Sequence, residues 1–277
     1  MADAAAPPDS LFAEIGPDTV PVPLVVSIPH TGVRVTPDVA RAFASPAMAA
    51  LPITDWHLHA LYDFLPGLGA TTIHARYSRV VVDLNRPPDA APLYPGRFET
   101  GLVPLETFQG ESIFSKPPNA DEIDTRRRRF HAPYHARLRA LLAEHVERFG
   151  FVVLIDAHSV ASTANRVHGA LEDEIYLGDC EGVTCEPWLR DSLASALRDE
   201  GLSVAVNQIY KGGYITRHYG AMPGVDAIQI EMAQRVYMDE KRPADAVGEP
   251  LFSAARERLR RTLARLANQL RERISRA

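Results

Sequence analysis

The sequence predicts an α/β fold: a single domain with three layers, α/β/α, around a mixed, largely parallel sheet. Short apolar runs rich in β-branched residues alternate with longer segments of helical spacing, and this alternation is typical of parallel sheets. The runs have no polar face, as expected for strands that helices cover on both sides. With 277 residues and 46% hydrophobic content, the chain can build one large core. No repeat or linker divides it, so we expect one domain over residues 1–277.

The first half of the chain begins with a loose leader, expected over residues 1–20 from its proline and glycine turn signals. Leu24–Ile28 is a largely apolar run rich in β-branched residues, which predicts a buried strand. Helical spacing over 55–65 ends at a pair of glycines, and two further apolar segments predict strands over 70–74 and 80–84. Residues 87–120 contain seven prolines and no periodicity. A segment of this length without periodicity is typical of a lid or binding loop.

The second half alternates helices and strands more regularly. A long helix is expected over about 121–149 because Gly150 provides the stop signal. The final helix, about 248–275, has leucines at a spacing of three and four residues, which indicates core packing. Residues 156–185 are expected to be irregular, and 211–220 to be a loop that contains glycines. The remaining predicted elements are a helix over about 187–200 and strands over 151–155, 202–207 and 227–231.

Composition excludes several classes of function. The net charge of −5, with 23% charged residues, gives no basic surplus for binding nucleic acid or an anionic membrane. Cys180 and Cys185 are too few for a disulfide framework or a thiolate metal site, so we expect free thiols in a reducing compartment. The first ten residues do not resemble a signal peptide, and no apolar run reaches the roughly 20 residues of a membrane span. A cytoplasmic location is therefore expected.

Two predicted strands lead directly to a histidine. His30 follows Leu24–Ile28, and His158 lies two residues after Asp156 at the end of the strand over 151–155. Ligands of open α/β sheets bind beyond the carboxyl ends of the strands, and an Asp two residues before a His is typical of a carboxylate that orients a metal ligand. A dyad of His158 with Ser159 is the alternative, but no Gly-x-Ser-x-Gly elbow surrounds that serine. The pattern predicts a metal site.

Asp55 is a candidate for the third ligand, since zinc accepts histidine nitrogen together with carboxylate oxygen and leaves one position open in catalytic sites. Asp55 also stands where a helix cap is expected. His57 and His59 compete with it for the ligand role. The local sequence leaves these alternatives open, because it contains neither His-Glu-x-x-His nor His-x-x-Glu-His.

Other polar residues follow the predicted strands. Glu231 ends the strand over 227–231, and a buried glutamate is costly unless it is paired, protonated or functional; it suits a general base. Asn85 and Arg86 follow the strand over 80–84, and an arginine there can bind a carboxylate through two hydrogen bonds. The alternative is a turn asparagine beside a surface arginine. Arg217, in the loop over 211–220, either contacts an acidic substrate or belongs to a flexible loop.

Taken together, these segments resemble the N-formylglutamate amidohydrolase family, in the expected order over roughly residues 20–240. That family is similar to the zinc carboxypeptidase and aspartoacylase group, which implies a zinc exopeptidase-like fold. The motifs are Ser27-Ile28-Pro29-His30-Thr31-Gly32, Thr54-Asp55, Ser78-Arg79-Val80-Val81-Val82-Asp83-Leu84-Asn85-Arg86-Pro87, Asp156-Ala157-His158-Ser159, Gly212-Gly213-Tyr214-Ile215-Thr216-Arg217, Gln229-Ile230-Glu231-Met232 and Tyr237-Met238-Asp239.

The resemblance implies zinc-dependent hydrolysis of N-formyl-L-glutamate to formate and L-glutamate, a step of histidine degradation. Zinc, or another divalent metal, would be held by three ligands, with one residue as general base and three at the substrate. The implied ligands are His30, Asp55 and His158, the base is Glu231, and the substrate residues are Asn85, Arg86 and Arg217. Aspartoacylases carry their acidic ligand three residues after the first histidine, where this chain has Val33, so Asp55 is expected instead.

Two other functions remain open. A related zinc amidohydrolase or carboxypeptidase could act on another N-acyl acidic amino acid, and the segment 87–120 would decide between substrates. A non-catalytic binding protein on the same scaffold is a further alternative, against which Glu231 and both histidines argue. The expected partner is a small acidic molecule, with neither nucleic acid nor membrane; the sequence does not give the oligomeric state.

Overall fold

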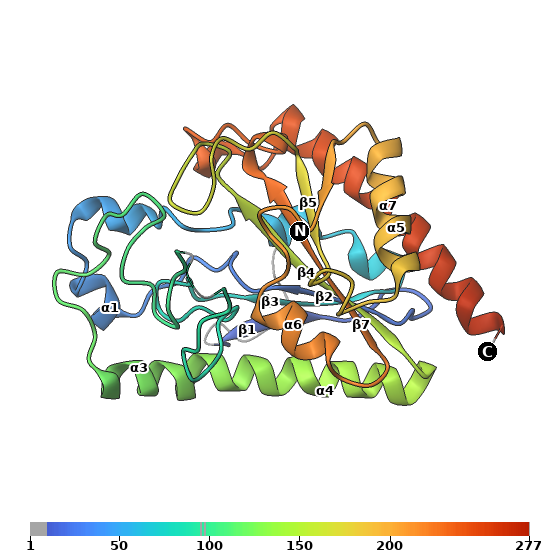
Figure 1. Cartoon of the computed structure of the whole chain (residues 1–277), viewed down its shortest axis with the longest axis horizontal. Helices are drawn as coiled ribbons and strands as arrows, with labels where there is room; N and C mark the ends of the chain where they lie inside the picture. The colour runs from blue at the N-terminus through green and yellow to red at the C-terminus, as the bar shows by residue number, and fades with distance from the viewer. Residues whose placement is uncertain (1–9, 95, 97, 277) are drawn as a thin grey trace.

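A computed structural model of the chain describes residues 10–94, 96 and 98–276. Within these residues, seven strands form one sheet in the order β1-β3-β2-β4-β7-β5-β6 (Figure 1). The strands are β1 (Phe12–Ile15), β2 (Leu24–Ile28), β3 (Thr71–Ala75), β4 (Val152–Val160), β5 (Ile175–Gly178), β6 (Val204–Val206) and β7 (Val225–Ala233).

The centre of the sheet is parallel, because β3, β2, β4 and β7 all run in the same direction. Strand β1 is antiparallel to β3, while β5 is antiparallel to β7 and parallel to β6. The predicted mixed, largely parallel sheet is therefore confirmed. Parallel neighbours end at the same edge, so the residues that follow β2 and those at the ends of β4 and β7 lie together.

Helices cover both faces of the sheet, which confirms the three-layer architecture (Figure 1). One face carries α4 (Ala132–Phe149) and α6 (Tyr214–Gly220), and the other carries α2 (Leu58–Leu61), α5 (Pro187–Asp199) and α7 (Pro250–Arg276). The remaining helical segments are α1 (Pro37–Arg41), α3 (Ala120–Arg126), a π-helical turn at Arg127–His131, and 3-10 turns at Pro46–Ala50, Leu65–Leu68, Gln234–Val236 and Pro243–Asp245.

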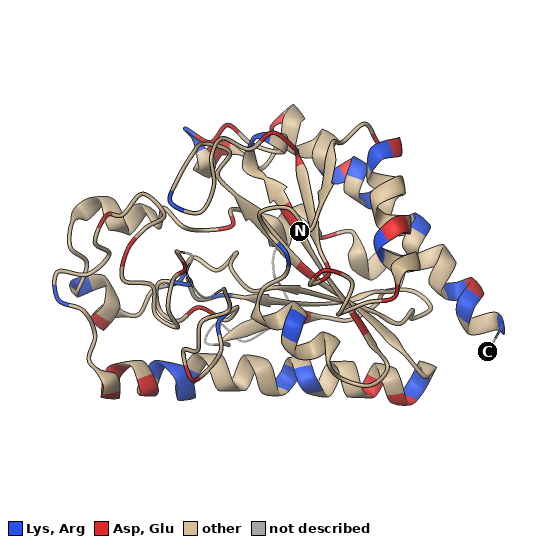
Figure 2. Ribbon diagram, in the orientation of Figure 1, with Lys and Arg blue, Asp and Glu red and all other residues tan. Residues whose placement is uncertain are grey.

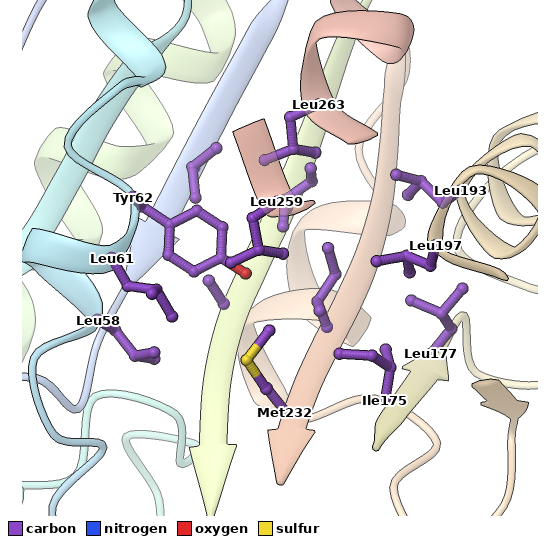
Figure 3. Close-up of a cluster of buried hydrophobic side chains, with 14 of the residues drawn as sticks. Leu58, Leu61, Tyr62, Ile175, Leu177, Leu193, Leu197, Met232, Leu259 and Leu263 are labelled. Carbon is purple, nitrogen blue, oxygen red and sulfur yellow. The ribbon is translucent and has the colours of Figure 1, made fainter. Parts of the chain in front are cut away.

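Two apolar cores form because residues that alternate along each strand point to opposite faces. On β4, Val153 and Ile155 pack with α2, α5 and α7, while Val152 and Leu154 pack with α4 and α6. Figure 3 shows the first core, in which leucines of α5 and α7 meet the side chains of α2 and the sheet. Burying each such side chain contributes about 1.5–3 kcal/mol. The leucine stripe predicted on the final helix is buried there: Leu259, Leu263, Leu266 and Leu270.

The long helix predicted over 121–149 is present as α3, the π-helical turn and α4 in succession. It begins at Asn119, which forms a capping box with Glu122 and so satisfies two free backbone N–H groups. It ends at Gly150, where φ is 80°, a conformation that glycine adopts without strain.

Some predicted elements differ from the structure. Residues 80–84 are not a strand but buried turns, in which the N–H of Val81 donates to Ser78 and that of Asp83 donates to Leu102. The helix over 55–65 is reduced to α2 and a 3-10 turn, and the strand over 202–207 to β6. Strand β4 continues through His158 to Val160, β5 lies in the segment expected to be irregular, and part of the loop over 211–220 is helix α6.

The leader expected over residues 1–20 lies partly outside the described residues; within the described part, Phe12–Ile15 pairs with β3. Charges of both signs are interspersed along α4 and α7 in the view of Figure 2. None of the helices in the described residues is both long and apolar enough to cross a membrane. Both cysteines are free thiols, as predicted.

Candidate metal centre and active site

His30, Asp55 and His158 come together at the carboxyl edge of the sheet. Oδ2 of Asp55 lies 3.0 Å from Nδ1 of His158 and 3.7 Å from Nδ1 of His30. All three residues are buried, and their candidate ligand atoms lie within 4.8 Å of one another. A backbone hydrogen bond from Asp55 to the carbonyl of His30 fixes the turn that carries the carboxylate. Two nitrogens and one oxygen form a donor set that suits a catalytic zinc.

The competing ligand candidates His57 and His59 are not part of this group. Nε2 of His57 lies 2.7 Å from the carbonyl of Pro243. Nδ1 of His59 lies 2.9 Å from the hydroxyl of Thr31. The geometry therefore brings Asp55 rather than either neighbouring histidine to the two strand-end histidines.

His30 is oriented by Asp83, whose Oδ1 lies 2.7 Å from Nε2. A carboxylate accepts the proton of Nε2, so Nδ1 keeps its lone pair. That Nδ1 is buried and has no hydrogen-bond partner in the described part of the chain. Leaving a buried polar atom unpaired is costly. The cost is offset if Nδ1 is a metal ligand, and in this respect the residues fit a bound metal.

His158 is held from both sides. Nδ1 faces Asp55, and Nε2 lies 3.1 Å from Oδ1 of Asp156. Burial lowers the pKa of His158, but the two carboxylates outweigh it and hold the pKa well above its usual value. Burial likewise raises the pKa of Asp55, but the hydrogen bond with His158 and the charges of the two histidines outweigh burial and hold this pKa well below its usual range. The centre thus stabilises positive charge, as a cation site requires.

Asn85 fixes the outer side of His158. Its Oδ1 accepts the N–H of Ile215 at 2.7 Å, so its Nδ2 must face the sheet. There Nδ2 lies 3.1 Å from Oδ2 of Asp156 and 2.9 Å from Nε2 of His158. The predicted substrate residue Asn85 is therefore also part of the support around the metal centre.

Arg79 and Asp83 lie within the metal centre's surroundings, where the sequence reasoning placed neither residue. Nη2 of Arg79 lies 2.6 Å from Oδ2 of Asp83, and both side chains are buried. Nη1 lies 3.8 Å from Asp55, so the guanidinium balances two buried carboxylates. The available signal was their spacing of four residues around a short apolar run, within a motif already quoted for the resemblance.

Glu231 lies opposite His158 across the pairing of β4 and β7. One oxygen, Oε2, accepts a 2.7 Å hydrogen bond from Nε2 of Gln229. Burial raises the pKa of the carboxyl group to about 8. A raised carboxyl pKa beside a polar cluster is typical of a group that transfers protons.

A cavity of about 550 Å³ opens over this cluster, a size suited to a small ligand. His30, Asp55, His158 and Glu231 line it, together with Asn85 and Arg86. Part of the cavity wall comes from the proline-rich segment 87–120, as expected for a binding loop. The wall residues of that segment are Leu93, Tyr94, Phe98, Glu99, Thr100 and Phe108.

The two predicted carboxylate-binding arginines differ in position. Arg86 lines the cavity, and Thr100 and the carbonyl of Asn85 accept three of its N–H groups. Two of the five guanidinium N–H groups therefore remain for a ligand. Arg217 is not among the lining residues; its guanidinium lies 5.5 Å from the ring centroid of Tyr94. Arg166 and Lys211 also line the cavity, and each is paired with a surface glutamate.

Comparison of the sequence with known proteins points to one family. The model of the N-formylglutamate amidohydrolase family matches residues 22–238. An N-formylglutamate deformylase of Pseudomonas putida is 40% identical over 226 residues, which are 80% of this chain and 84% of that protein. One from Pseudomonas aeruginosa is 41% identical over 258 residues, covering 92% of this chain and 96% of that protein.

Solved structures give the same result. The crystal structure of an N-formylglutamate amidohydrolase from Ralstonia eutropha has a TM-score of 0.82 at 28% identity, and the match covers 95% of this chain and 98% of that one. A protein from Agrobacterium tumefaciens, with a TM-score of 0.71 at 19% identity and 96% of each chain covered, supports the fold alone. By its sequence and by the arrangement of its strands, this chain belongs to the N-formylglutamate amidohydrolase family.

Proposed function

We propose that this protein hydrolyses N-formyl-L-glutamate to formate and L-glutamate with a divalent metal at His30, Asp55 and His158. The observation that carries the proposal is the placement of Glu231 beside that buried cluster, on the floor of one small cavity. Relatives named N-formylglutamate deformylase, about 40% identical over most of their length, support the choice of substrate.

Zinc suits the two nitrogens and one oxygen of the site, and other divalent metals also bind such ligands. A metal bound there would polarise the formyl oxygen, make a water molecule more acidic and favour the ionised form of nearby carboxylates. Asp83 accepts a hydrogen bond on the far side of His30, which keeps the ring nitrogen that faces Asp55 available as a ligand. Asp156 and the amide of Asn85 lie on the far side of His158.

Glu231 is the general base of the proposed reaction. Its carboxylate takes a proton from the attacking water and then delivers a proton to the amine nitrogen as the C–N bond breaks. One oxygen is held by Gln229, and the other has no hydrogen-bond partner in the described residues, so it is free for this transfer. Such proton transfer contributes about 10²- to 10⁴-fold to the rate.

Arg86 is the proposed clamp for a substrate carboxylate. N-formyl-L-glutamate has little apolar surface, so its affinity must come from charge-assisted hydrogen bonds. Arg86 is held rigidly by Thr100 and presents two further N–H groups, while Asn85 orders the adjoining wall. The guanidinium of Arg217 contacts the ring of Tyr94. We propose that Arg217 supports this wall of the cavity and makes it more positively charged.

The test is release of formate from N-formyl-L-glutamate by the purified protein, before and after chelation and after restoration of zinc. Loss on chelation and recovery with zinc would support both the substrate and the metal. N-acetyl-L-glutamate in parallel tests the alternative of another N-acyl acidic amino acid. Absence of formate from metal-loaded protein would refute the proposed reaction.

A further inference from the structure

We infer that Gln229 is a positioning residue that holds the carboxylate of Glu231 in place beside the candidate metal centre. The inference deepens the proposed function and rests on it. Gln229 and Glu231 are two residues apart on β7, so their side chains share one face of the strand. Both are buried, and both line the cavity.

Two hydrogen bonds fix the amide of Gln229. Its Oε1 accepts the backbone N–H of Gly213 at 2.7 Å, and its Nε2 donates to Oε2 of Glu231 at 2.7 Å. A backbone N–H can meet only the oxygen end of an amide, so the first bond determines that the nitrogen end faces the carboxylate. The second bond has a carboxylate as its acceptor, which makes it one of the stronger kinds.

The two carboxylate oxygens of Glu231 therefore have different roles. Oε2 is anchored by Gln229, while Oε1 has no protein partner in the described residues and stays available to water in the cavity. A glutamate side chain has several rotatable bonds, and catalytic groups must be held within about 0.5 Å of the productive geometry. The amide of Gln229 provides that constraint and compensates part of the cost of burying the carboxylate.

The same backbone segment also supports the metal side of the site. Two residues after Gly213, the N–H of Ile215 donates to Asn85, whose amide contacts Asp156 and His158. The short segment 213–215 therefore contacts both the residue that holds the proposed base and the residue that contacts a candidate metal ligand. A Cβ at residue 213 would lie 2.3 Å from Nδ2 of Asn85, so only glycine allows this close approach.

The experiment replaces Gln229 with methionine, which has similar length but neither donates nor accepts here. We expect kcat to fall by about 10- to 100-fold, the range for partners that orient active-site groups, while KM and bound metal stay close to wild type. Gln229→Glu keeps the length of the side chain but places a second carboxyl group beside Glu231, and it is expected to lower kcat as well. Gln269→Met on the exposed face of α7 is the matched control and should change nothing.

A double mutant distinguishes an effect that acts through Glu231 from an independent effect on the active site. If Gln229 acts through Glu231, Gln229→Met should lower kcat no further when Glu231 is already glutamine, whereas independent effects would multiply. Losses that multiply in the double mutant, or a folded Gln229→Met protein with wild-type kcat, would overturn the inference. Wild-type protein is measured in the same assay: if it releases no formate when loaded with metal, the proposed function fails instead.

Discussion

Nε2 of His30 lies 2.7 Å from Oδ1 of Asp83, and Oδ2 of the same carboxylate lies 2.6 Å from Arg79. The chain Arg79–Asp83–His30 thus determines which nitrogen of the imidazole carries the proton. It also leaves the opposite nitrogen, beside Asp55, without a partner in the described part of the chain. Tautomer and ring orientation are fixed before any ligand arrives.

Asp83→Asn should weaken metal binding by about 10- to 100-fold, because the carboxylate that orients the ring of His30 is lost. Competition with a chelating dye would measure the affinity. Asp121→Asn, on the exposed first turn of α3, is the control. An unchanged affinity in Asp83→Asn would contradict the orienting role.

His158→Ala should abolish stoichiometric metal binding, since it removes one of three candidate ligands. Metal content per chain, measured by elemental analysis after dialysis, checks this. His57→Ala and His59→Ala should retain the metal, because these side chains contact Pro243 and Thr31 instead. Retention of a full equivalent by His158→Ala would exclude it as a ligand.

Glu231→Gln should keep the metal but lower kcat by roughly 10²–10⁴, the usual contribution of general acid–base catalysis. The amide preserves the size of the side chain and can still accept the hydrogen bond from Gln229. Formate release under saturating substrate measures kcat. Normal turnover would remove Glu231 from the mechanism.

Arg86→Lys should raise KM for N-formyl-L-glutamate by about 10- to 100-fold, because a lysine cannot reproduce a planar pair of donors held by Thr100. Arg217→Lys should have a smaller effect, since Arg217 contacts Tyr94 and is not among the residues that line the cavity. Steady-state kinetics of both variants tests the difference. A larger effect at Arg217 would show that it, rather than Arg86, is the main carboxylate contact.

Acid should destabilise the fold partly through His135. Burial, reinforced by His131 beside it, lowers the pKa of His135 to about 3, whereas an unfolded histidine titrates near 6.5. The stability that the neutral ring contributes is present above about pH 6.5 and is lost as the pH falls toward 3, with a slope of at most about 1.4 kcal/mol per pH unit. Denaturant unfolding of wild type and His135→Gln at pH 7 and pH 5 should show a weaker pH dependence in the variant; equal dependence would contradict this.

Several elements could be predicted because their signals are local. Leu24–Ile28 is a short run rich in β-branched residues, and the helix that begins at Asn119 has a capping box and a glycine stop. The histidine of each of two parallel strands could be expected at one edge, because parallel strands place their carboxyl ends together. The choice of Asp55, by contrast, came from family resemblance, since local spacing left His57 and His59 open.

The remaining features depend on distant contacts. The apolar run over 80–84 has the composition of a strand, but its N–H groups are satisfied by Ser78 and by Leu102, a loop residue. Strand β5 is four residues long and pairs with β7, more than 50 positions later in the chain by its register (Ile175↔Met232). The sequence does not show that Arg79 and Asp83 are buried, because only the fold shows which residues neutralise their charges.

The order of the strands has a consequence for biosynthesis. Asp55 and His158 are 103 positions apart, and β4, which carries His158, pairs with β2 on one side and with β7 on the other. A nascent polypeptide that has emerged as far as β4 already contains His30, Asp55 and His158, but Glu231 and Gln229 arrive only with β7. The three candidate metal ligands therefore leave the ribosome before the proposed base and the residue that holds it.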